Sequence, residues 1–278
     1  MRLTILVDNY VYSQKLKAEH GLSILIEHGD ESILFDCGQS DIVLSNAKIM
    51  GIDLNKITKI VLSHGHFDHT GGLLPILKYL NRGIDVYAHP LIFSEKLSRQ
   101  EDFNGSSINR YIGIPEKKET YEKKGARFLL INESEKISRD VYFSGKINKS
   151  DKEISDNELY TRDNDIYIKD PLHDDISLFI DLPETLVSVT GCAHSGILNI
   201  LNMAKEMELT SKKIAIIGGL HLSKKDDFYI DNIIREFNKY NIELLVPMHC
   251  TGIDAYVKLK NKFGTKCTIG AIGRTLEF

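Results

Sequence analysis

The stretch His64-Gly65-His66-Phe67-Asp68-His69 places three histidines and one aspartate within six residues. In extended backbone, residues i and i+2 project to the same side, so the side chains of His64, His66 and Asp68 can face one cavity. The side chain of His69 comes from the following turn and can serve a neighbouring site. Imidazole and carboxylate groups are good ligands for zinc, iron and manganese. The stretch therefore predicts a metal centre.

Three further histidines each follow a short apolar run that predicts a strand: His194, His221 and His249. His64 follows a run of the same kind, Lys59–Leu62. In open α/β sheets, ligands bind at the carboxyl edge of the strands, so histidines from neighbouring strands can meet there. A single histidine at a strand end is more often a structural residue. Four such placements, with a dense cluster at one of them, favour metal binding.

The first and last thirds of the chain alternate between apolar runs typical of strands and segments with helical apolar spacing. This alternation predicts a layered α/β architecture. We expect strands at Leu3–Val7, Ser23–Glu27, Ser32–Phe35, Lys59–Leu62, Asp85–Tyr87, Leu178–Ile180, Leu186–Val189, Ile214–Ile217 and Leu244–Val246. We expect helices at Asp41–Met50, Gly72–Leu80, Ser195–Met207, Phe228–Tyr240 and Ala255–Phe263.

The middle of the chain, at about 94–175, is rich in lysine, glutamate, aspartate, asparagine and serine, and its apolar periodicity is weak. We assign no elements there. We expect a polar insert or lid on a single domain that spans residues 1–278. Long segments of this kind in compact domains often carry function, so the insert is a candidate for a functional role.

The composition is that of an ordinary globular protein. The chain is 42% hydrophobic and 27% charged with a net charge of −4, so we expect no nucleic acid as a partner. No run approaches the roughly 18 apolar residues of a membrane span, and no signal peptide is evident. We therefore expect no membrane association and a cytoplasmic location. The widely separated cysteines, Cys37, Cys192, Cys250 and Cys267, argue against a disulfide framework. Association into a homo-oligomer stays open.

The pattern His64-x-His66-x-Asp68-His69, followed at a distance by His194 and His249, resembles that of the metallo-β-lactamase fold superfamily. The strand that ends in Asp36-Cys37-Gly38 resembles the early aspartate motif of that family. The resemblance spans most of the chain. It implies a four-layer αββα sandwich with the metal site at one edge of two packed sheets, in place of a single open sheet.

The same resemblance implies a cofactor of two divalent metal ions, with zinc as the first choice and iron or manganese as alternatives. Asp36 would orient the ligands without touching a metal. The ligands would form two sets, namely His64, His66 and His194 for the first metal and Asp68, His69 and His249 for the second.

One position departs from the family pattern. In most members, an aspartate from a Gly-Asp turn bridges the metals, and it lies between the last two histidine motifs. That place holds Gly218-Gly219-Leu220-His221 in this chain. His221 can bind a metal as a further ligand, but an imidazole cannot bridge two metals in the manner of a carboxylate. The departure leaves the geometry and the metal identity open.

Four segments resemble a narrower subgroup, the dihydropterin synthase-like proteins. Its named activity is 7,8-dihydropterin-6-methyl-4-(β-D-ribofuranosyl)aminobenzene-5'-phosphate synthase, a step in methanopterin assembly. This resemblance implies a phosphorylated, pterin-type small molecule as the substrate. The segments are Glu19-His20-Gly21-Leu22-Ser23, Thr190-Gly191-Cys192-Ala193-His194-Ser195-Gly196, Gly218-Gly219-Leu220-His221 and Met248-His249-Cys250-Thr251-Gly252.

The superfamily resemblance implies hydrolysis by a hydroxide generated at the metals, whereas the subgroup implies condensation, in which a carbon nucleophile displaces pyrophosphate. Asp68 is the candidate catalytic residue, because it is a ligand in either reaction and could hold the proton of an attacking water. We expect substrate contacts at His20, Ser195 and Thr251. Ser195 opens one predicted helix and Thr251 precedes another, and the free N–H groups at the start of a helix attract anions. A helix cap for Ser195 and a structural role for His20 are equally good interpretations.

Two other classes of function are alternatives. Cys192 and Cys250 each lie close to a predicted ligand histidine, so the chain could be a non-enzymatic, iron-based redox or oxygen sensor. Small buried core residues are the plainer interpretation of both cysteines. A nuclease is the other alternative, because some superfamily members cleave RNA. The acidic charge balance and the lack of a basic patch in the sequence argue against it.

Overall fold

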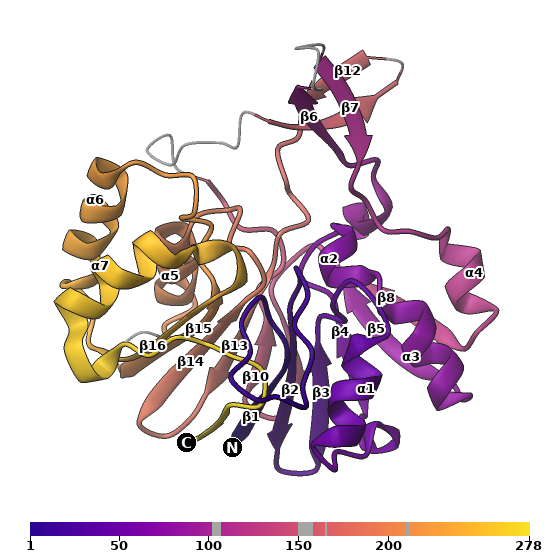
Figure 1. Ribbon diagram of the computed structural model, residues 1–278, viewed down its shortest axis with the longest axis horizontal. Coiled ribbons are helices and arrows are strands. Elements are labelled where there is room, and N and C mark those ends of the chain that lie inside the picture. Colours follow the sequence, from indigo (N-terminus) through magenta and orange to yellow (C-terminus); the bar gives the residue numbers. More distant parts are fainter. Residues whose placement is uncertain (102–106, 150–157, 165, 210–211) are drawn as a thin grey trace.

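Two β-sheets packed face to face form the centre of the molecule, and helices cover the outer face of each sheet (Figure 1). The structure is a computed structural model that describes residues 1–101, 107–149, 158–164, 166–209 and 212–278. This four-layer αββα arrangement confirms the fold class expected from the sequence. A single open sheet is wrong, because the strands that precede the predicted ligand histidines are divided between the two sheets.

The first sheet contains seven strands: β1 (Arg2–Val7), β2 (Ser23–His28), β3 (Glu31–Phe35), β4 (Lys59–Val61), β5 (Ile84–Ala88), β8 (Ala126–Leu130) and β17 (Thr275–Glu277). Their order across the sheet is β17-β1-β2-β3-β4-β5-β8. A short turn joins β2 to β3 as an antiparallel hairpin. Strands β3, β4, β5 and β8 run parallel, so their carboxyl ends share one edge.

The second sheet contains six strands: β9 (Glu135–Ser138), β10 (Val141–Phe143), β13 (Ser177–Asp181), β14 (Thr185–Thr190), β15 (Lys213–Gly219) and β16 (Ile242–Met248). Their order is β16-β15-β14-β13-β10-β9. Strands β14, β15 and β16 are parallel neighbours, so the three segments that follow them emerge side by side.

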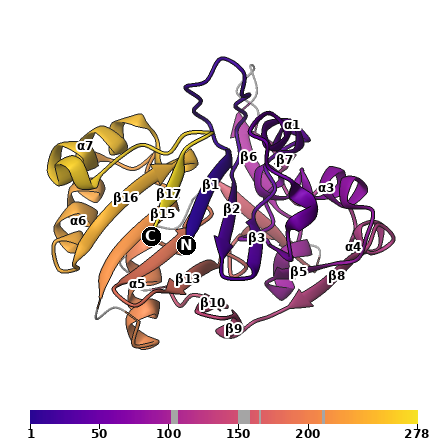
Figure 2. The ribbon, with the colours of Figure 1, turned by 90° about the horizontal axis from the view of Figure 1, so that it is seen from below.

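The outer layers lie on opposite sides of the paired sheets (Figure 2). Helices α1 (Ile42–Ile49), α3 (Leu73–Leu80) and α4 (Lys118–Glu122) flank the first sheet, and α5 (Ile197–Glu206), α6 (Asp227–Phe237) and α7 (Ile253–Phe263) flank the second. The shorter elements are α2 (Phe67–Thr70), η1 (Leu54–Lys56), η2 (Pro90–Phe93), η3 (His249–Thr251) and η4 (Gly264–Lys266). Among the described residues, no helix combines the length and apolar character that crossing a membrane requires.

Alternation along the strands decides which layer each side chain fills. On β1, Leu3 and Ile5 pack between the two sheets, whereas Leu6 packs against the helices of the first sheet. On β15, Ile217 faces the inter-sheet core and Ile216 faces the second helical layer. Both faces of these strands are therefore buried, which explains why they are continuous apolar runs in the sequence.

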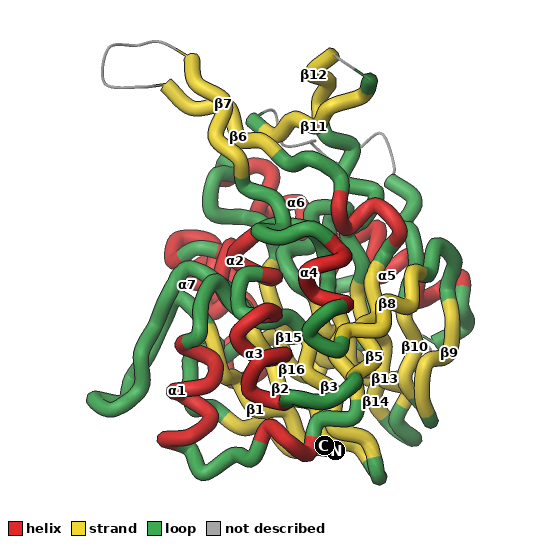
Figure 3. The backbone as a smooth tube through the Cα atoms, turned by 90° about the vertical axis from the view of Figure 1, so that its right-hand side faces the viewer, coloured by secondary structure: helices red, strands yellow, loops and turns green. Residues whose placement is uncertain are grey.

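The range expected as a polar insert, 94–175, contributes strands to three sheets. Strands β8, β9 and β10 pair within the two main sheets, so that part of the range belongs to the sandwich and not to an insert. A separate four-stranded sheet, which we call the small sheet, projects beyond the sandwich (Figure 3). It contains β6 (Leu97–Glu101), β7 (Ser107–Tyr111), β11 (Leu159–Asp163) and β12 (Ile166–Lys169).

The packing of α5 gives a first testable expectation. Leu201 is fully buried against the second sheet, so Leu201→Ala should leave a cavity and lower the free energy of unfolding by about 2–5 kcal/mol. Val257 of α7 is 47% exposed, so Val257→Ala should change it by less than about 0.5 kcal/mol. Urea denaturation followed by circular dichroism measures both values. Equal effects at the two positions would contradict this description of the outer layer.

Candidate metal centre

Each predicted ligand histidine outside the first cluster follows the carboxyl end of a parallel strand. His194 follows β14, His221 follows β15 and His249 follows β16. His64 follows β4 of the other sheet, yet its ring centroid lies 4.8 Å from that of His194. The edge where the two sheets meet therefore brings together histidines that are far apart in the sequence.

The first donor set is His64, His66 and His194. Nε2 of His64 lies 2.9 Å from Nδ1 of His66, and the ring centroid of His194 lies 5.0 Å from that of His66. Within the described part of the chain, Nε2 of His66 and both ring nitrogens of His194 have no hydrogen-bond partner. Two nitrogens bound to one tetrahedral zinc ion at about 2.0–2.1 Å would lie about 3.3 Å apart, so this spacing suits a shared cation.

The second donor set is Asp68, His69 and His249. The Nε2 atoms of His69 and His249 are 3.2 Å apart. Oδ2 of Asp68 lies 3.2 Å from the Nε2 of His249 and 3.7 Å from that of His69. One carboxylate oxygen and two imidazole nitrogens thus converge on one point, as the ligands of a divalent cation do.

Asp36 orients ligands in both sets. Its Oδ2 accepts hydrogen bonds from Nδ1 of His69 at 2.6 Å and from Oγ of Ser63 at 2.7 Å. Since the Ser63 hydroxyl donates its proton to Asp36, it accepts from Nδ1 of His64, 2.9 Å away. The Nε2 lone pairs of His64 and His69 are thereby left for a metal. A Cβ at Gly191 would lie 2.1 Å from Ser63 Oγ, so only glycine permits this network.

Asp8 and Asn9, which the sequence analysis missed, hold the last ligand in the same way. Oδ1 of Asn9 lies 2.9 Å from Nδ1 of His249, and Oδ1 of Asp8 accepts the backbone N–H of His249 at 2.9 Å. Both residues follow β1 directly, so the strand-end argument that found the histidines could have found them. The outer nitrogen of His249 is thus occupied, and its Nε2 faces Asp68.

Four residues at this edge adopt left-handed backbone conformations, which are strained for residues other than glycine. They are Asp36 (φ 58°), Ala193 (φ 58°), His221 (φ 50°) and His249 (φ 47°). Each lies where the chain turns away from a strand end. Strain of this kind persists only where surrounding contacts maintain it, and it is concentrated here around the donor sets.

Burial keeps the first donor set neutral. It lowers the pKa of His66 to about 4, and burial together with neighbouring histidines holds the pKa values of His64 and His194 well below their usual range. In the second set, burial alone would lower the pKa of His69. The carboxylates of Asp36 and Asp68 outweigh this effect and raise the pKa of His69 to about 9. The first set therefore offers neutral imidazoles, whereas His69 would have to release a proton when a metal binds.

Two thiols and His221 lie against the donor sets. Sγ of Cys192 is 3.2 Å from Nε2 of His69, and the His221 ring centroid is 4.3 Å from that of His194. Ligand atoms of Cys192, His221 and Cys250 all lie within 4.8 Å of one another. Burial raises the pKa of the Cys192 thiol well above its usual range, since the site is shielded from water.

The three expected substrate contacts differ in position. His20 is half exposed on the cavity wall, with Nε2 3.2 Å from Oδ2 of Asp68. Ser195 is 1% exposed and does not cap α5, which begins after Gly196. The Thr251 hydroxyl accepts the backbone N–H of Leu220 at 3.0 Å and is 2% exposed. Only His20 of the three reaches the cavity, because backbone packing covers the other two.

A buried ion cluster, also missed from the sequence, ties the small sheet to the donor sets. Lys96, at the base of β6, contacts Asp174 and lies 3.0 Å from Oδ2 of Asp170. The other carboxylate oxygen of Asp174 accepts the N–H of Gly65 at 2.9 Å, between the first two ligand histidines. The adjacent Asp175 accepts the N–H of Ser195 at 2.7 Å. These residues position both ligand loops.

A cavity of about 530 Å³ opens over the donor sets. The small sheet and its flanking residues form one wall and the ligand loops form the other. The lining residues are Asn9, Tyr10, His20, His66, Phe67, Asp68, Ser98, Arg110, Ile112, Glu158, Leu159, Cys192, His194, His221, Ser223, Lys224, His249, Cys250 and Gly252. A site of this composition combines apolar walls, metal donors and two basic side chains.

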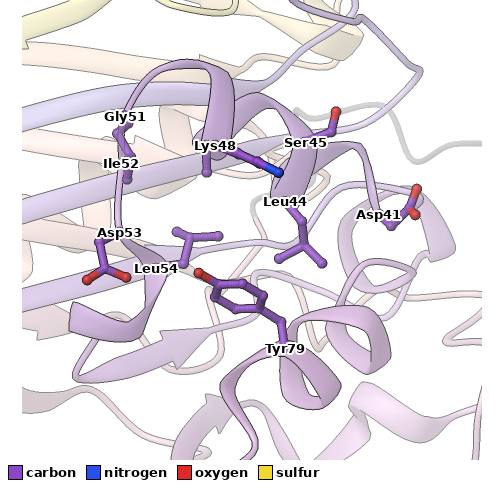
Figure 4. Close-up of a pocket in the computed structure, with 10 residues that line it drawn as sticks. Asp41, Leu44, Ser45, Lys48, Gly51, Ile52, Asp53, Leu54 and Tyr79 are labelled. Carbon is purple, nitrogen blue, oxygen red and sulfur yellow. The ribbon is translucent and has the colours of Figure 1, made fainter.

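A second hollow, of about 600 Å³, lies between α1, the loop that follows it and Tyr79 of α3 (Figure 4). Leu44, Ile52 and Leu54 supply apolar surface there, and Lys48 lies at its side. Neither histidine nor cysteine is among the described residues that line it. The chemistry of the molecule is therefore concentrated in the cavity over the donor sets.

Comparison with known proteins decides the family. The sequence pattern of the metallo-beta-lactamase superfamily matches residues 16–193, more than half of the chain. The chain belongs to the metallo-beta-lactamase superfamily. It is 31% identical over 266 residues to the 7,8-dihydropterin-6-methyl-4-(beta-D-ribofuranosyl)-aminobenzene-5'-phosphate synthase of Methanocaldococcus jannaschii, and the match covers 92% of this chain and 89% of that protein.

Two further relatives agree with this superfamily membership. The uncharacterized protein MJ0448 of the same organism is 35% identical over 92% of this chain and 93% of its own length. The crystal structure of Tm1679, a metal-dependent hydrolase of the beta-lactamase superfamily, matches with a TM-score of 0.85 and 32% identity. That match covers 100% of this chain and 99% of the other. The chain is thus a metal-dependent enzyme of this superfamily, as the resemblance implied.

The buried ion cluster generates a pH-dependent prediction. Lys96→Met would leave the carboxylates of Asp170 and Asp174 buried without their cation, at a cost of about 3–5 kcal/mol in unfolding free energy at neutral pH. Burial alone would raise the pKa of Asp174, but the charge of Lys96 outweighs this effect and holds that pKa below its usual 3.8. The stability from this pair is therefore present above pH 3.8 and is lost as the pH falls through the lowered pKa.

The difference between wild type and Lys96→Met should accordingly shrink in acid, as measured by urea denaturation from pH 7 to about pH 3. Lys118→Met is the matched control, because Lys118 forms an exposed pair with Glu122 at 3.2 Å and should contribute less than about 0.5 kcal/mol. A pH-independent loss at Lys96 would show that the lysine acts through packing and not through its charge.

Proposed function

We propose that the chain holds a two-metal centre and acts on a phosphorylated, pterin-type small molecule, by hydrolase-like or dihydropterin synthase-like chemistry. The observation that carries the proposal is the meeting of the two donor sets on the wall of one cavity. Bound divalent metals, zinc first and iron or manganese otherwise, would activate a water or polarise the bond under attack. The relative named as a synthase supports the pterin-type substrate.

The cavity has the size and the chemistry that such a substrate needs. Small-molecule sites usually enclose about 300–1,000 Å³, and this one encloses about 530 Å³. The side chains of Phe67, Ile112 and Leu159 supply apolar surface for a flat ring. Arg110 supplies positive charge for a phosphate group, for which arginine is well suited because it can donate two parallel hydrogen bonds. Lys224, the other basic residue of the lining, is paired with Glu158.

Different residues of the chain would bind the metals, transfer a proton and hold the ligands in position around the reacting group. Asp68 would bind the second metal through Oδ2, and its other carboxylate oxygen would hold a proton during the reaction. His20 lies 3.2 Å from Oδ2 on the open side of the cavity. The hydrogen bond to Asp68 raises the pKa of His20, so His20 can carry a proton to a leaving group. Asp36, Asn9 and Asp174 hold the donors in place.

Family membership favours an enzyme over the iron-based sensor. The nuclease alternative has little support, because ribonuclease Z of Borrelia duttonii matches only 69 residues, at 39% identity, which is 25% of this chain and 21% of that enzyme. A net charge of −4 also gives RNA no electrostatic attraction.

Metal analysis tests the two-metal centre. Protein purified without chelators should contain close to two equivalents of metal, and His66→Ala should contain about one or fewer and lose more than about 100-fold in turnover. That loss exceeds the 10–100-fold typical of residues that only orient ligands. His28→Ala is the control, because His28 pairs with Asp140, 3.3 Å away, on the far side of the sandwich. Less than one equivalent in the wild type would refute the proposal.

Substrate assays separate the two reactions. A dihydropterin diphosphate supplied alone tests hydrolysis, and the addition of an aminobenzene riboside phosphate tests condensation. Pyrophosphate release that depends on the second substrate, with a joined product detected by mass spectrometry, would establish the synthase. Release that is independent of it would establish the hydrolase.

Arg110 provides a test of the phosphate contact. Arg110→Ala should raise the KM for a phosphorylated substrate by about tenfold or more, with little change in kcat, since the loss of one charge-assisted hydrogen bond costs about 1.5–3 kcal/mol. Arg99→Ala is the matched control on the same small sheet, because Arg99 stacks over Tyr160 at 4.3 Å and does not line the cavity. Equal effects of both substitutions would indicate a general disturbance of the small sheet.

A further inference from the structure

The Gly-Gly segment at the end of β15 packs closely against the segment that carries Cys192. A side chain at position 219 would begin 2.4 Å from the backbone oxygen of Gly191, 2.6 Å from Sγ of Cys250 and 3.2 Å from the Cα of Cys192. A side chain there would collide with these atoms. Glycine at position 219 therefore allows the close approach of the two cysteine-bearing segments.

The sulfur of Cys192 lies close to histidines of both donor sets. Its Sγ lies 3.2 Å from Nε2 of His69. The same sulfur lies within 4.8 Å of the ligand atoms of His64 and His194, and within that distance of those of His69 and His249. Two donors on one zinc ion can be at most about 4.4 Å apart, the sum of a Zn–S bond of about 2.3 Å and a Zn–N bond of about 2.1 Å. The 3.2 Å contact with His69 lies within this limit, and the sulfur is close to histidines of both donor sets.

We propose that the thiolate of Cys192 bridges the two metal ions. The inference rests on the proposed two-metal function. On metal binding, the S–H bond breaks, the sulfur keeps the electron pair for its bonds to the metals, and the proton leaves to solvent. The step changes no oxidation state, so it needs no oxidant or reductant.

Cys250 has a different role. Among the described residues, it shares a potential metal cluster only with Cys192 and His221, and with neither complete donor set. Its Sγ lies 3.4 Å from the backbone oxygen of Cys192, as a hydrogen-bond donor would. Cys250 therefore supports the segment that carries the bridge. A thiolate bridge also predicts the native metal, since soft sulfur ligands favour zinc or iron over manganese.

Titration of the metal-free protein with Co²⁺ under anaerobic conditions tests the bridge. Thiolate ligation gives an intense sulfur-to-cobalt charge-transfer band in the near ultraviolet, which imidazole and carboxylate ligands do not give. We expect this band to grow until two equivalents are bound. Cys192→Ala should abolish it and weaken binding of Co²⁺ by at least about tenfold, the lower limit for residues that support a metal site. Cys250→Ala should keep most of the band.

Two further variants complete the experiment. Cys267→Ala controls for the loss of a buried thiol, because Cys267 is fully buried in the outer core of the second sheet, and it should behave as wild type. Cys192→Asp supplies a carboxylate and should bind two Co²⁺ ions without the band. This variant keeps the test decisive if Cys192→Ala fails to fold, as judged by circular dichroism.

The outcomes separate the bridge from the function on which it rests. Loss of the band in Cys192→Ala and Cys192→Asp, with binding rescued in the latter, supports the bridge. Loss of the band in Cys250→Ala alone overturns it and assigns the thiolate to Cys250. Two bound Co²⁺ ions with no band in the wild type overturn the bridge but leave the two-metal function standing. Binding of less than one equivalent overturns both.

Discussion

The carboxylate of Asp36 is the interaction on which the metal centre depends. It is fully buried at a left-handed turn after β3, and it accepts hydrogen bonds from Ser63 and His69. Through Ser63 it also decides which nitrogen of His64 is protonated. One charged group therefore sets the orientation of a ligand in each donor set. Without it, the imidazoles could rotate or change tautomer, and the lone pairs would no longer converge.

Burial fixes the geometry of these side chains, but it also raises the free-energy cost of any charge that they carry. Buried histidines resist protonation, and buried carboxylates resist ionisation unless a cation or a hydrogen-bond donor is close. The two sheets meet this requirement by placing each carboxylate against donors: Asp36 against Ser63, Asp68 against His20, and Asp174 against Lys96. A divalent cation would satisfy one of the two unpartnered ring nitrogens of His194, so binding of metal and stability of the site should be linked.

Much of the centre could be predicted from the sequence, because its geometry is encoded locally. His64 and His66 are close in sequence, and parallel strands carry His194 and His249 to a common edge. Their role as metal ligands stays a prediction. Other parts have no local pattern. Lys96 and Asp174 are 78 residues apart and look like ordinary surface charges until the small sheet folds over them. Strands β8 and β9 are partly exposed edge segments of mixed polarity, so their apolar period is too weak to identify them.

The small sheet meets the ligand motif at few points. The backbone oxygen of Ile112 accepts the N–H of Phe67 at 2.9 Å. The ion pair between Lys96 and Asp174 holds the base of the small sheet against the sandwich. The side chains that would face a substrate, such as Arg110, lie beyond those anchors. Substrate preference and metal chemistry are therefore separable properties of this molecule. Substitutions beyond those anchors would therefore alter the proposed substrate wall while the hydrogen bonds within the donor sets stay intact.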